Sequence, residues 1–181
     1  MQRPRARKRE DEETASSVSP EQIRERTFQR AVKLLAAKPR SIAELRERLM
    51  QGRGANKAVV ETVIARLREY GYLDDERFAF GYASLKVRQR PVGKRRLQRE
   101  LQLKKVDRAV ADEALEAVFA ETSEEELIDR ALEKRIRLRG QPKDRAEAKK
   151  LFDHLLRQGF PFELVSAKVR AAAQTSIDED D

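Results

Sequence analysis

The residues with the clearest chemical bias lie in the middle of the sequence, where basic side chains recur without acidic ones. No Asp or Glu occurs between Glu76 and Glu100. A one-sided run of charge repels itself unless a counter-charge lies against it, and nucleic-acid phosphates supply one while releasing their condensed cations. The sequence therefore predicts a central basic patch that binds nucleic acid or an acidic partner. Its residues are Lys86, Arg88, Arg90, Lys94, Arg95, Arg96 and Arg99, extended by Lys104 and Lys105.

Five aromatic residues lie close to the central basic patch and are candidates for stacking on single-stranded bases. They are Tyr70, Tyr72, Phe78, Phe80 and Tyr82. Helical spacing favours core packing for Phe78 and Tyr82, whereas Tyr72 and Phe80 are expected to be exposed. If no nucleic acid binds there, the basic run has a simpler interpretation as a solvated helix face followed by a basic loop.

No set of residues is spaced for catalysis. The single histidine, His154, lies in a predicted helix and is interpreted as a surface or half-buried residue rather than a general base. Asp74, Asp75 and Glu76 suggest a divalent-metal cluster, but no further acid or histidine completes it, and helix capping explains three acids at a helix start. The seven glycines lie at predicted helix ends and breaks, so no phosphate-binding glycine loop is present. We therefore expect no enzymatic activity, no cofactor and no metal site.

A helix-turn-helix that reads a DNA sequence is a further alternative. Residues 41–49, a turn at Gly52 and Gly54, and residues 57–70 would form a short helix followed by a recognition helix. However, Glu61 and Glu69 would then face the phosphates, and no strand-like wing follows. Short glycine turns also join the helices of any bundle, so sequence-specific binding is the less favoured interpretation.

The composition favours a helical protein with much exposed surface. Charged residues make up 40% of the 181 residues, against about 25% in an average globular domain. Cysteine is absent, which excludes disulfides and thiolate metal sites and indicates a reducing compartment. No apolar run is long enough to cross a membrane, and no apolar segment follows the basic N-terminus as a secretory signal requires. We therefore expect a cytoplasmic protein.

The net charge of +8 is unevenly distributed along the chain. Residues 24–73 carry a net +7, residues 74–120 a net +3 and residues 121–173 a net +2. An anionic partner is therefore expected to bind the first two thirds of the folded part.

Apolar residues at helical spacing predict nine helices between residues 21 and 173. Ser41 and Glu44 form a predicted capping box at the start of the second helix, with a hydroxyl followed three residues later by a carboxylate. Phe78, Tyr82 and Leu85 mark the fourth helix, and Leu138 in the seventh is expected to face the core.

The helices recur in register as three similar units. Paired leucines in the second helix of each unit, and one apolar residue in the third, are separated by 52 and then by 54 residues. They are Leu45 and Leu49, Leu97 and Leu101, Leu151 and Leu155, with Val63, Leu115 and Val169. Units too small for a large core of their own are stabilised by packing on their neighbours. The predicted fold is therefore all-α, an elongated array of three tandem three-helix repeats without strands.

Two charged tails flank the repeats. The first 20 residues have no periodic apolar residues and the chain ends in an acidic segment, so neither end buries enough apolar surface to fold. We therefore predict disordered tails at residues 1–22 and 174–181. The three-helix repeats are expected at residues 23–73, 74–120 and 121–173.

Four motifs follow one another at a recognisable spacing over about residues 24–172. They are Ala31-x-x-Leu34-Leu35, Ser41-x-x-Glu44-Leu45-x-x-x-Leu49, Gly71-Tyr72-Leu73-Asp74-Asp75-Glu76-Arg77-Phe78-Ala79 and Gly93-x-x-x-Leu97-x-x-Glu100-Leu101. In this order they resemble the bacterial RecX family, which regulates the RecA recombinase. The chain departs from the family at Leu103-Lys104-Lys105-Val106, where a glycine usually follows the helix.

The resemblance implies three tandem three-helix units and a regulatory rather than an enzymatic role. RecX-like proteins bind along the groove of the RecA–single-stranded-DNA filament and inhibit ATP hydrolysis, strand exchange and co-protease activity. This implies a part in DNA repair, homologous recombination and the SOS response, with nonspecific contacts to single-stranded DNA. The central basic patch would then face DNA phosphates or an acidic recombinase surface, and we expect a monomer without membrane contact.

Two other functions fit the residues alone. A standalone nucleic-acid-binding helical repeat would need no recombinase, and its function would decline as ionic strength rises. A structural adaptor with a solvated basic face would have no affinity for DNA even at low salt. A regulator directed at a filament would instead retain a protein–protein component at higher salt.

Overall fold

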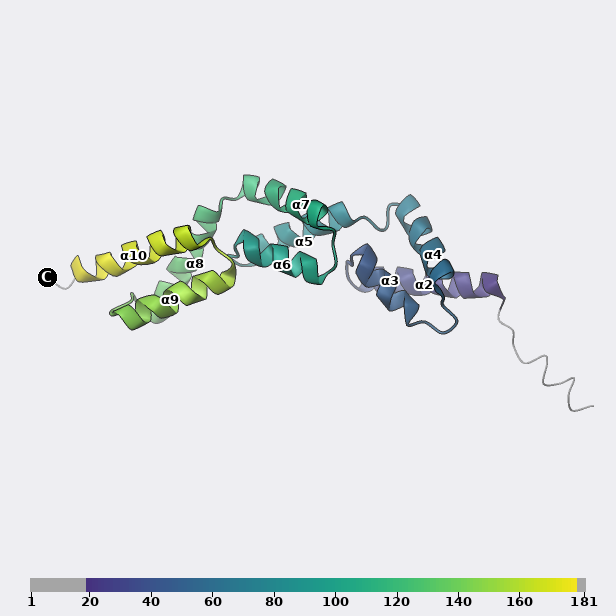
Figure 1. Cartoon of the computed structure of the whole chain (residues 1–181), viewed down its shortest axis with the longest axis horizontal. Helices are drawn as coiled ribbons and strands as arrows, with labels where there is room; N and C mark the ends of the chain where they lie inside the picture. The colour runs from purple at the N-terminus through teal and green to yellow at the C-terminus, as the bar shows by residue number, and fades with distance from the viewer. Residues whose placement is uncertain (1–18, 179–181) are drawn as a thin grey trace, which may run out of the picture. The chain divides into compact units, whose positions relative to one another are not determined.

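The structure, a computed structural model, describes residues 19–178 of the chain, with side chains described as far as Ala173. Within this range the chain forms nine α-helices and no strand (Figure 1), which confirms the all-α prediction. The helices are α2 (Pro20–Ala37), α3 (Ile42–Met50), α4 (Lys57–Glu69), α5 (Asp75–Gln89), α6 (Lys94–Leu103), α7 (Arg108–Glu121), α8 (Glu124–Arg139), α9 (Arg145–Gln158) and α10 (Phe162–Asp178). Residues 1–18 and 179–181, which belong to the two predicted tails, lie outside the described residues.

The first and last helices extend further than the sequence predicts. α2 begins at Pro20, within the segment 1–22 expected to be a tail, because Ser19 and Gln22 form a reciprocal capping box. The Gln22 N–H donates to Ser19 Oγ (3.2 Å) and the Ser19 N–H donates to Gln22 Oε1 (3.1 Å). Proline suits the first helical position, where no N–H is needed. α10 continues to Asp178, five residues into the segment expected to be a tail.

Side chains that precede the helices supply their first hydrogen bonds. Each of five capping residues accepts a backbone N–H from the first turn of the helix that follows it: Asn56, Asp74, Asp107, Ser123 and Asp144. Such caps satisfy N–H groups that have no acceptor inside the helix. Local sequence therefore decides where these helices begin.

The described residues form two compact units. The first contains residues 19–39 and 45–73, and the second contains residues 40–44 and 74–178. In the first unit α2 packs against α4. Its fully buried apolar residues include Ala31, Leu45, Leu49, Val60 and Leu67.

The second unit holds α5 to α10 around one continuous core. α7 packs against both α5 and α6, and α9 packs against both α8 and α10. α5 presents Ala79, Ala83 and Val87 to the core at four-residue spacing, and small side chains allow a close approach between helices. Leu85 lies outside this face and is 54% exposed.

The leucines in register confirm the repeat. All six paired leucines of the second helices are buried, as are the three apolar residues of the third helices. They lie on α3, α6 and α9, and on α4, α7 and α10. Equivalent positions of the three repeats therefore have the same packing role.

α8 extends beyond the core of the second unit. Its last buried residue is Ala131, whereas the helix continues to Arg139. Leu138, in the last turn, is 67% exposed, so the prediction that it faces the core is wrong. The two final turns of α8 therefore lie outside the apolar packing and carry mainly charged side chains.

Candidate nucleic-acid and partner interface

The central basic patch lies entirely in the second unit, on α5, α6 and the loops that follow them. Its members differ in exposure, because some of them have partners within the protein. Arg88, Arg90, Arg95, Arg99 and Lys105 are exposed, whereas Lys86, Lys94, Arg96 and Lys104 are half-buried.

Glu100 on α6 binds three cations of the patch. Its carboxylate lies 3.0 Å from Arg96 Nε and 3.6 Å from Arg90 Nη2. Lys86 Nζ approaches it at 3.9 Å from α5. Tyr82, also on α5, donates its hydroxyl proton to Glu100 Oε2 at 2.7 Å. One carboxylate therefore joins α6 to α5 and its C-terminal end through Tyr82, Lys86 and Arg90, and holds Arg96 within α6.

The surroundings of Glu100 shift two ionisation equilibria. Burial opposes the negative charge of Glu100, but the hydrogen bonds from Tyr82 and Arg96 and the charges of Lys86 and Arg96 outweigh it, so its pKa is lowered. Burial raises the pKa of Tyr82, and the hydrogen bond to the Glu100 carboxylate raises it further. At neutral pH the site therefore holds an ionised carboxylate and a protonated phenol.

Two more cations of the patch pair with distant acids. Lys94 pairs with Glu116 of α7, and Lys104 Nζ lies 3.5 Å from Glu44 Oε1. The Lys104 ammonium also lies 5.1 Å from the ring centroid of Tyr82, within range of a cation–π contact. These acids lie far away in the sequence, so they are invisible in the run from 86 to 105.

The remaining arginines of the patch are not neutralised in this way. Arg88, Arg95 and Arg99 form no ion pair with the part of the chain that the structure describes. Arg95 and Arg99 lie one turn apart on α6, and Arg99 borders a shallow hollow between α6 and α7. These three guanidinium groups are therefore available to an anion without the loss of an internal pair.

The start of α6 is fixed by a close contact between two glycines. The Gly93 N–H donates to the Gln158 carbonyl at 3.0 Å. A Cβ atom at Gly93 would lie 2.4 Å from the carbonyl carbon and oxygen of Gly159, and one at Gly159 would lie 2.4 Å from the Arg96 nitrogen. The motif glycine Gly93 is therefore needed for close packing of α6 on the end of α9.

α6 ends without the glycine that usually follows this helix in the resembling family. Lys105 takes the left-handed conformation instead, with a φ of 58°. The Val106 N–H reaches the Leu101 carbonyl at 3.2 Å, as in a helix that ends on a left-handed residue. The helix therefore ends in the left-handed conformation that a glycine would adopt, at the steric cost of placing a lysine side chain in that conformation.

Ser41 and Glu44 form only half of the predicted capping box. Ser41 Oγ accepts the Glu44 N–H at 3.1 Å, but the Glu44 carboxylate pairs with Lys104. The Ser41 hydroxyl donates to the Lys104 carbonyl, and Ser41 is fully buried. Residues 40–44 thus belong to the second unit through the end of α6.

Two of the aromatic residues are packed and two are exposed, as the sequence predicts. Phe78 and Tyr82 stack with ring centroids 6.0 Å apart and pack against the core of the second unit. Tyr72 is 68% exposed and Phe80 is 39% exposed, which confirms the exposure expected of them.

Helix capping accounts for Asp74 and Asp75, two of the three neighbouring acids that suggest a metal cluster. Asp74 Oδ1 accepts the N–H groups of Glu76 (2.8 Å) and Arg77 (3.1 Å). Asp75 Oδ1 accepts the Ile42 N–H at 2.8 Å. Among the described residues, no three acids, histidines or cysteines are grouped as a metal would require. In the same range, no helix has the length and apolar character to cross a membrane.

The helix-turn-helix alternative gains no support from α4. Glu61 pairs with Arg46, with Arg46 Nε 2.6 Å from Glu61 Oε1, and this hydrogen bond lowers the pKa of Glu61. The face expected to read DNA therefore presents an ionised carboxylate held in an ion pair. No strand follows α4 in the part of the chain that the structure describes.

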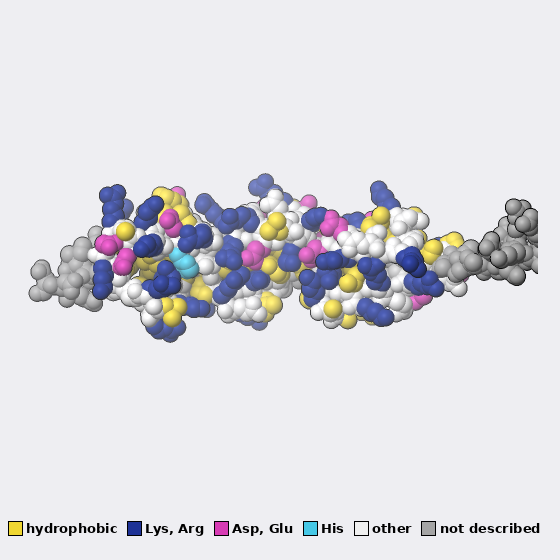
Figure 2. Space-filling view, turned by 90° about the horizontal axis from the view of Figure 1, so that it is seen from below, with side chains coloured by type: hydrophobic (Ala, Val, Ile, Leu, Met, Phe, Trp, Pro, Cys, Tyr) yellow, Lys and Arg dark blue, Asp and Glu magenta, His cyan; other side chains and the backbone are white. Residues whose placement is uncertain are grey.

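The sequence interpretation missed a second concentration of basic residues, which we call the α8–α9 cluster. It comprises Lys134, Arg135, Arg137, Arg139, Lys143, Arg145, Lys149 and Lys150. Only two acids accompany these eight cations between residues 134 and 150, and none of the eight forms an ion pair within the described range. Figure 2 shows Lys and Arg side chains around the imidazole of the only histidine in this region. Net charge counted over a short stretch of sequence, rather than over a whole repeat, is the signal that would have identified this cluster.

Three models of one protein family match this chain in order. They are described as the first, second and third three-helix domains of RecX, and they match residues 28–67, 74–115 and 123–169. The matched segments correspond to the three repeats of the structure.

Individual relatives and solved structures agree with the family models. The chain is 42% identical over 110 residues to the regulatory protein RecX of Treponema pallidum, a match that covers 61% of this chain and 66% of that relative. It is 35% identical to RecX of Halorhodospira halophila, over 83% of this chain and 88% of the relative. The crystal structure of RecX from Lactobacillus salivarius has the same fold, with a TM-score of 0.72 and 17% identity over 84% of this chain and 97% of that one.

Proposed function

This chain belongs to the RecX family of regulatory proteins, and from that membership we propose that it binds the RecA–single-stranded-DNA filament. Binding inhibits the ATPase and strand-exchange activities of the filament in DNA repair and recombination. The observation that carries the proposal is the complete order of three RecX three-helix domains between residues 28 and 169. Exposed arginines without internal partners support a contact with a polyanionic filament.

In this proposal the central basic patch has two kinds of members. The cations held by Glu100 and Glu116 join α6 to α5 and α7, and the pair of Lys104 with Glu44 holds residues 40–44 at the end of α6. Arg88, Arg95 and Arg99 bind DNA phosphates or acidic side chains of the recombinase. Each phosphate contact adds nonspecific, salt-sensitive affinity, and contacts by several repeats at once raise the overall avidity.

The test is the single-stranded-DNA-dependent ATPase of RecA at moderate salt, with this protein added below the concentration of RecA. We expect strong inhibition at substoichiometric amounts, because each bound molecule acts on a filament rather than on one site. If inhibition is absent while DNA binding is retained, the proposal is wrong and the chain is a standalone nucleic-acid-binding protein.

Charge reversal tests the placement of the contact. Arg95→Glu with Arg99→Glu is expected to weaken inhibition at least tenfold, because two exposed cations become anions that repel phosphates. The matched control is Arg24→Glu with Arg26→Glu, which changes the net charge equally on the exposed surface of α2. Equal loss of inhibition in both variants would show that net charge, and not this surface, governs binding.

A further inference from the structure

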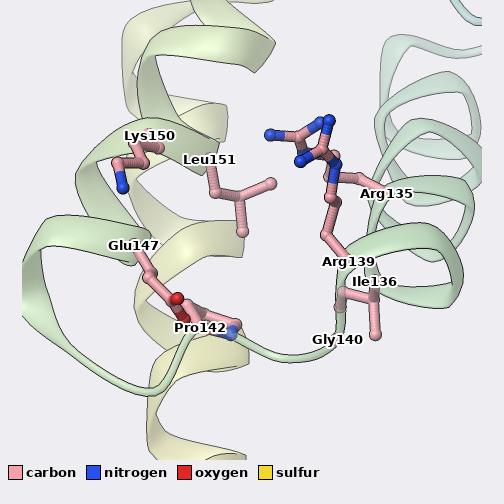
Figure 3. Close-up of a pocket in the computed structure, with 8 residues that line it drawn as sticks. All are labelled: Arg135, Ile136, Arg139, Gly140, Pro142, Glu147, Lys150 and Leu151. Atoms are coloured by element: carbon pink, nitrogen blue, oxygen red, sulfur yellow. The ribbon is translucent and has the colours of Figure 1, made fainter.

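A hollow of about 220 Å³ lies between the final turns of α8 and the first half of α9, within the second unit. Arg135 and Arg139 of α8 and Lys150 of α9 line it, together with Glu147, Pro142 and Leu151. Figure 3 shows both arginine side chains extending from α8 toward the space beside Leu151, with Pro142 and Glu147 at the other end. Pro142 and Leu151 are buried. The hollow therefore combines an apolar wall with three cationic side chains.

The two arginines repel each other where they are placed. Arg135 and Arg139 are four residues apart and so lie on the same face of α8, an arrangement that destabilises a helix when the charges are alike. Neither has an ion-pair partner among the described residues. An anion bound in the hollow would remove this repulsion.

The nearby acids are already engaged at the start of α9. Glu147 Oε2 accepts the Lys143 N–H at 3.0 Å, and Asp144 Oδ1 accepts the Glu147 N–H at 2.7 Å. Both carboxylates therefore serve the first turn of the helix, where the helix dipole favours negative charge. Neither is the counter-charge of the arginine pair.

We propose that this hollow binds a phosphate group of a nucleic-acid backbone, held by the guanidinium groups of Arg135 and Arg139 and by the ammonium of Lys150. A phosphodiester accepts several hydrogen bonds at once, and guanidinium forks match its oxygens in pairs. The apolar wall strengthens these contacts by excluding part of the water.

The surroundings favour a polymer over a small free anion. Lys134, Arg137 and Lys149 continue the positive charge on the exposed surfaces of α8 and α9, beyond the hollow itself. A chain of phosphates is attracted along such a surface, whereas a single phosphate needs only the hollow. The choice of nucleic acid as the source of the phosphate rests on the proposed function.

His154 is a built-in reporter for this site. It is the only histidine of the chain and follows Lys150 by one turn of α9. Burial lowers its pKa, and the positive charges of Arg135 and Arg157 lower it further. An anion bound to Arg135 neutralises part of this field and so raises the pKa of His154.

The experiment is an NMR titration of the His154 Hε1 signal against pH in the full-length chain. It is run without ligand, with saturating oligothymidylate, and with inorganic phosphate at the same phosphate concentration. The oligonucleotide is expected to raise the pKa of His154. If oligothymidylate binds, as fluorescence anisotropy of the same sample reports, but leaves the titration unchanged, the proposal is wrong. A shift with inorganic phosphate and none with the oligonucleotide overturns the choice of nucleic acid.

Variants separate this site from the central basic patch. Arg139→Gln with Lys150→Gln keeps Arg135 beside His154 but removes two phosphate donors, and is expected to abolish the shift induced by oligothymidylate. It also lowers the slope of log affinity against log salt by about 0.7, the loss of one single-strand phosphate contact. The matched control, Arg95→Gln with Arg99→Gln, is expected to retain the shift at saturating oligonucleotide, and a shift that persists in Arg139→Gln/Lys150→Gln overturns the proposal. No recombinase is present, so failure of filament inhibition and failure of this site are observed separately.

Discussion

The second and third repeats carry similar numbers of cations in similar lengths of chain and hold them differently. Nine basic residues and one acid lie between residues 86 and 105, and eight basic residues and two acids lie between residues 134 and 150. In the second repeat, three glutamates neutralise five of the nine cations. In the third, the two acids bind the backbone at a helix start instead.

Charge in the sequence is therefore a poor measure of the charge that is available to a ligand. Two of the three glutamates that bind the central basic patch, Glu44 and Glu116, lie outside its run of sequence. A partner would have to open these pairs to bind their cations, and opening a pair leaves a carboxylate without its counter-charge. The α8–α9 cluster keeps its charge available for the opposite reason, since α8 extends beyond the core.

The largest expected effect concerns the glycine contact that joins the two repeats. Gly159→Ala places a Cβ 2.4 Å from the Arg96 backbone, at a residue whose φ is +94°. We expect the free energy of unfolding to fall by about 3 kcal/mol, since overpacking and a disfavoured backbone conformation add.

The matched control is Gly81→Ala on the exposed side of α5, where an added Cβ meets nothing within 4 Å. It is expected to raise stability by about 1 kcal/mol, because alanine is the better helix former. Urea denaturation measures both changes, and a stable Gly159→Ala variant would show that the contact between the repeats is loose.

A smaller effect is expected from Glu100→Gln, which removes the shared carboxylate of the central basic patch. Lys86, Arg90 and Arg96 then repel one another, and we expect a loss of about 2 kcal/mol at neutral pH. The same change leaves three more cations unpaired, so it is expected to increase affinity for single-stranded DNA. Unchanged affinity would mean that these cations do not face the ligand.

The pH dependence of this variant follows from the lowered pKa of Glu100. A lowered pKa contributes stability that is present above the unfolded value of about 4.5 and is lost as the pH falls through the folded value. The stability difference between the wild-type chain and Glu100→Gln should therefore shrink below about pH 4.5. A difference that is constant from pH 7 to pH 3 would contradict the ion-pair account.

The smallest effect is expected from Lys105→Gly. Glycine adopts the left-handed conformation without steric cost, so we expect the free energy of unfolding to rise by about 1 kcal/mol. Lys38→Gly is the control, because Lys38 is an exposed lysine at the end of α2 whose φ of −166° is extended backbone that any residue adopts. Thermal denaturation of the two variants should give melting temperatures that move in opposite directions.

Much of the fold can be read from the sequence because its signals are local. Helix periodicity, capping residues and the leucines at intervals of 52 and 54 residues identify the three repeats. Leu138 misleads because α8 continues past the apolar core of the second unit. That extension is visible only once the packing of α8 is known.

The candidate site is less accessible to sequence reasoning. Which cations are neutralised depends on pairs such as Lys104 with Glu44 and Lys94 with Glu116, whose members lie 60 and 22 residues apart. The α8–α9 cluster was hidden for another reason, since the acidic first turn of α8 cancels it when charge is summed over the repeat. The absence of a glycine after α6 is visible in the sequence, but only the structure shows that Lys105 takes the left-handed conformation.

The most direct test of this account compares paired with unpaired cations in one binding measurement. Affinity for a labelled oligothymidylate is measured by fluorescence anisotropy over a range of salt concentrations. The variants are Arg95→Gln with Arg99→Gln, and Lys86→Gln with Arg90→Gln. We expect the first variant to lower the salt slope by about 1.4, which corresponds to two single-strand phosphate contacts, and the second variant to leave the slope unchanged. A loss of slope confined to the second variant, or equal in both, would contradict it.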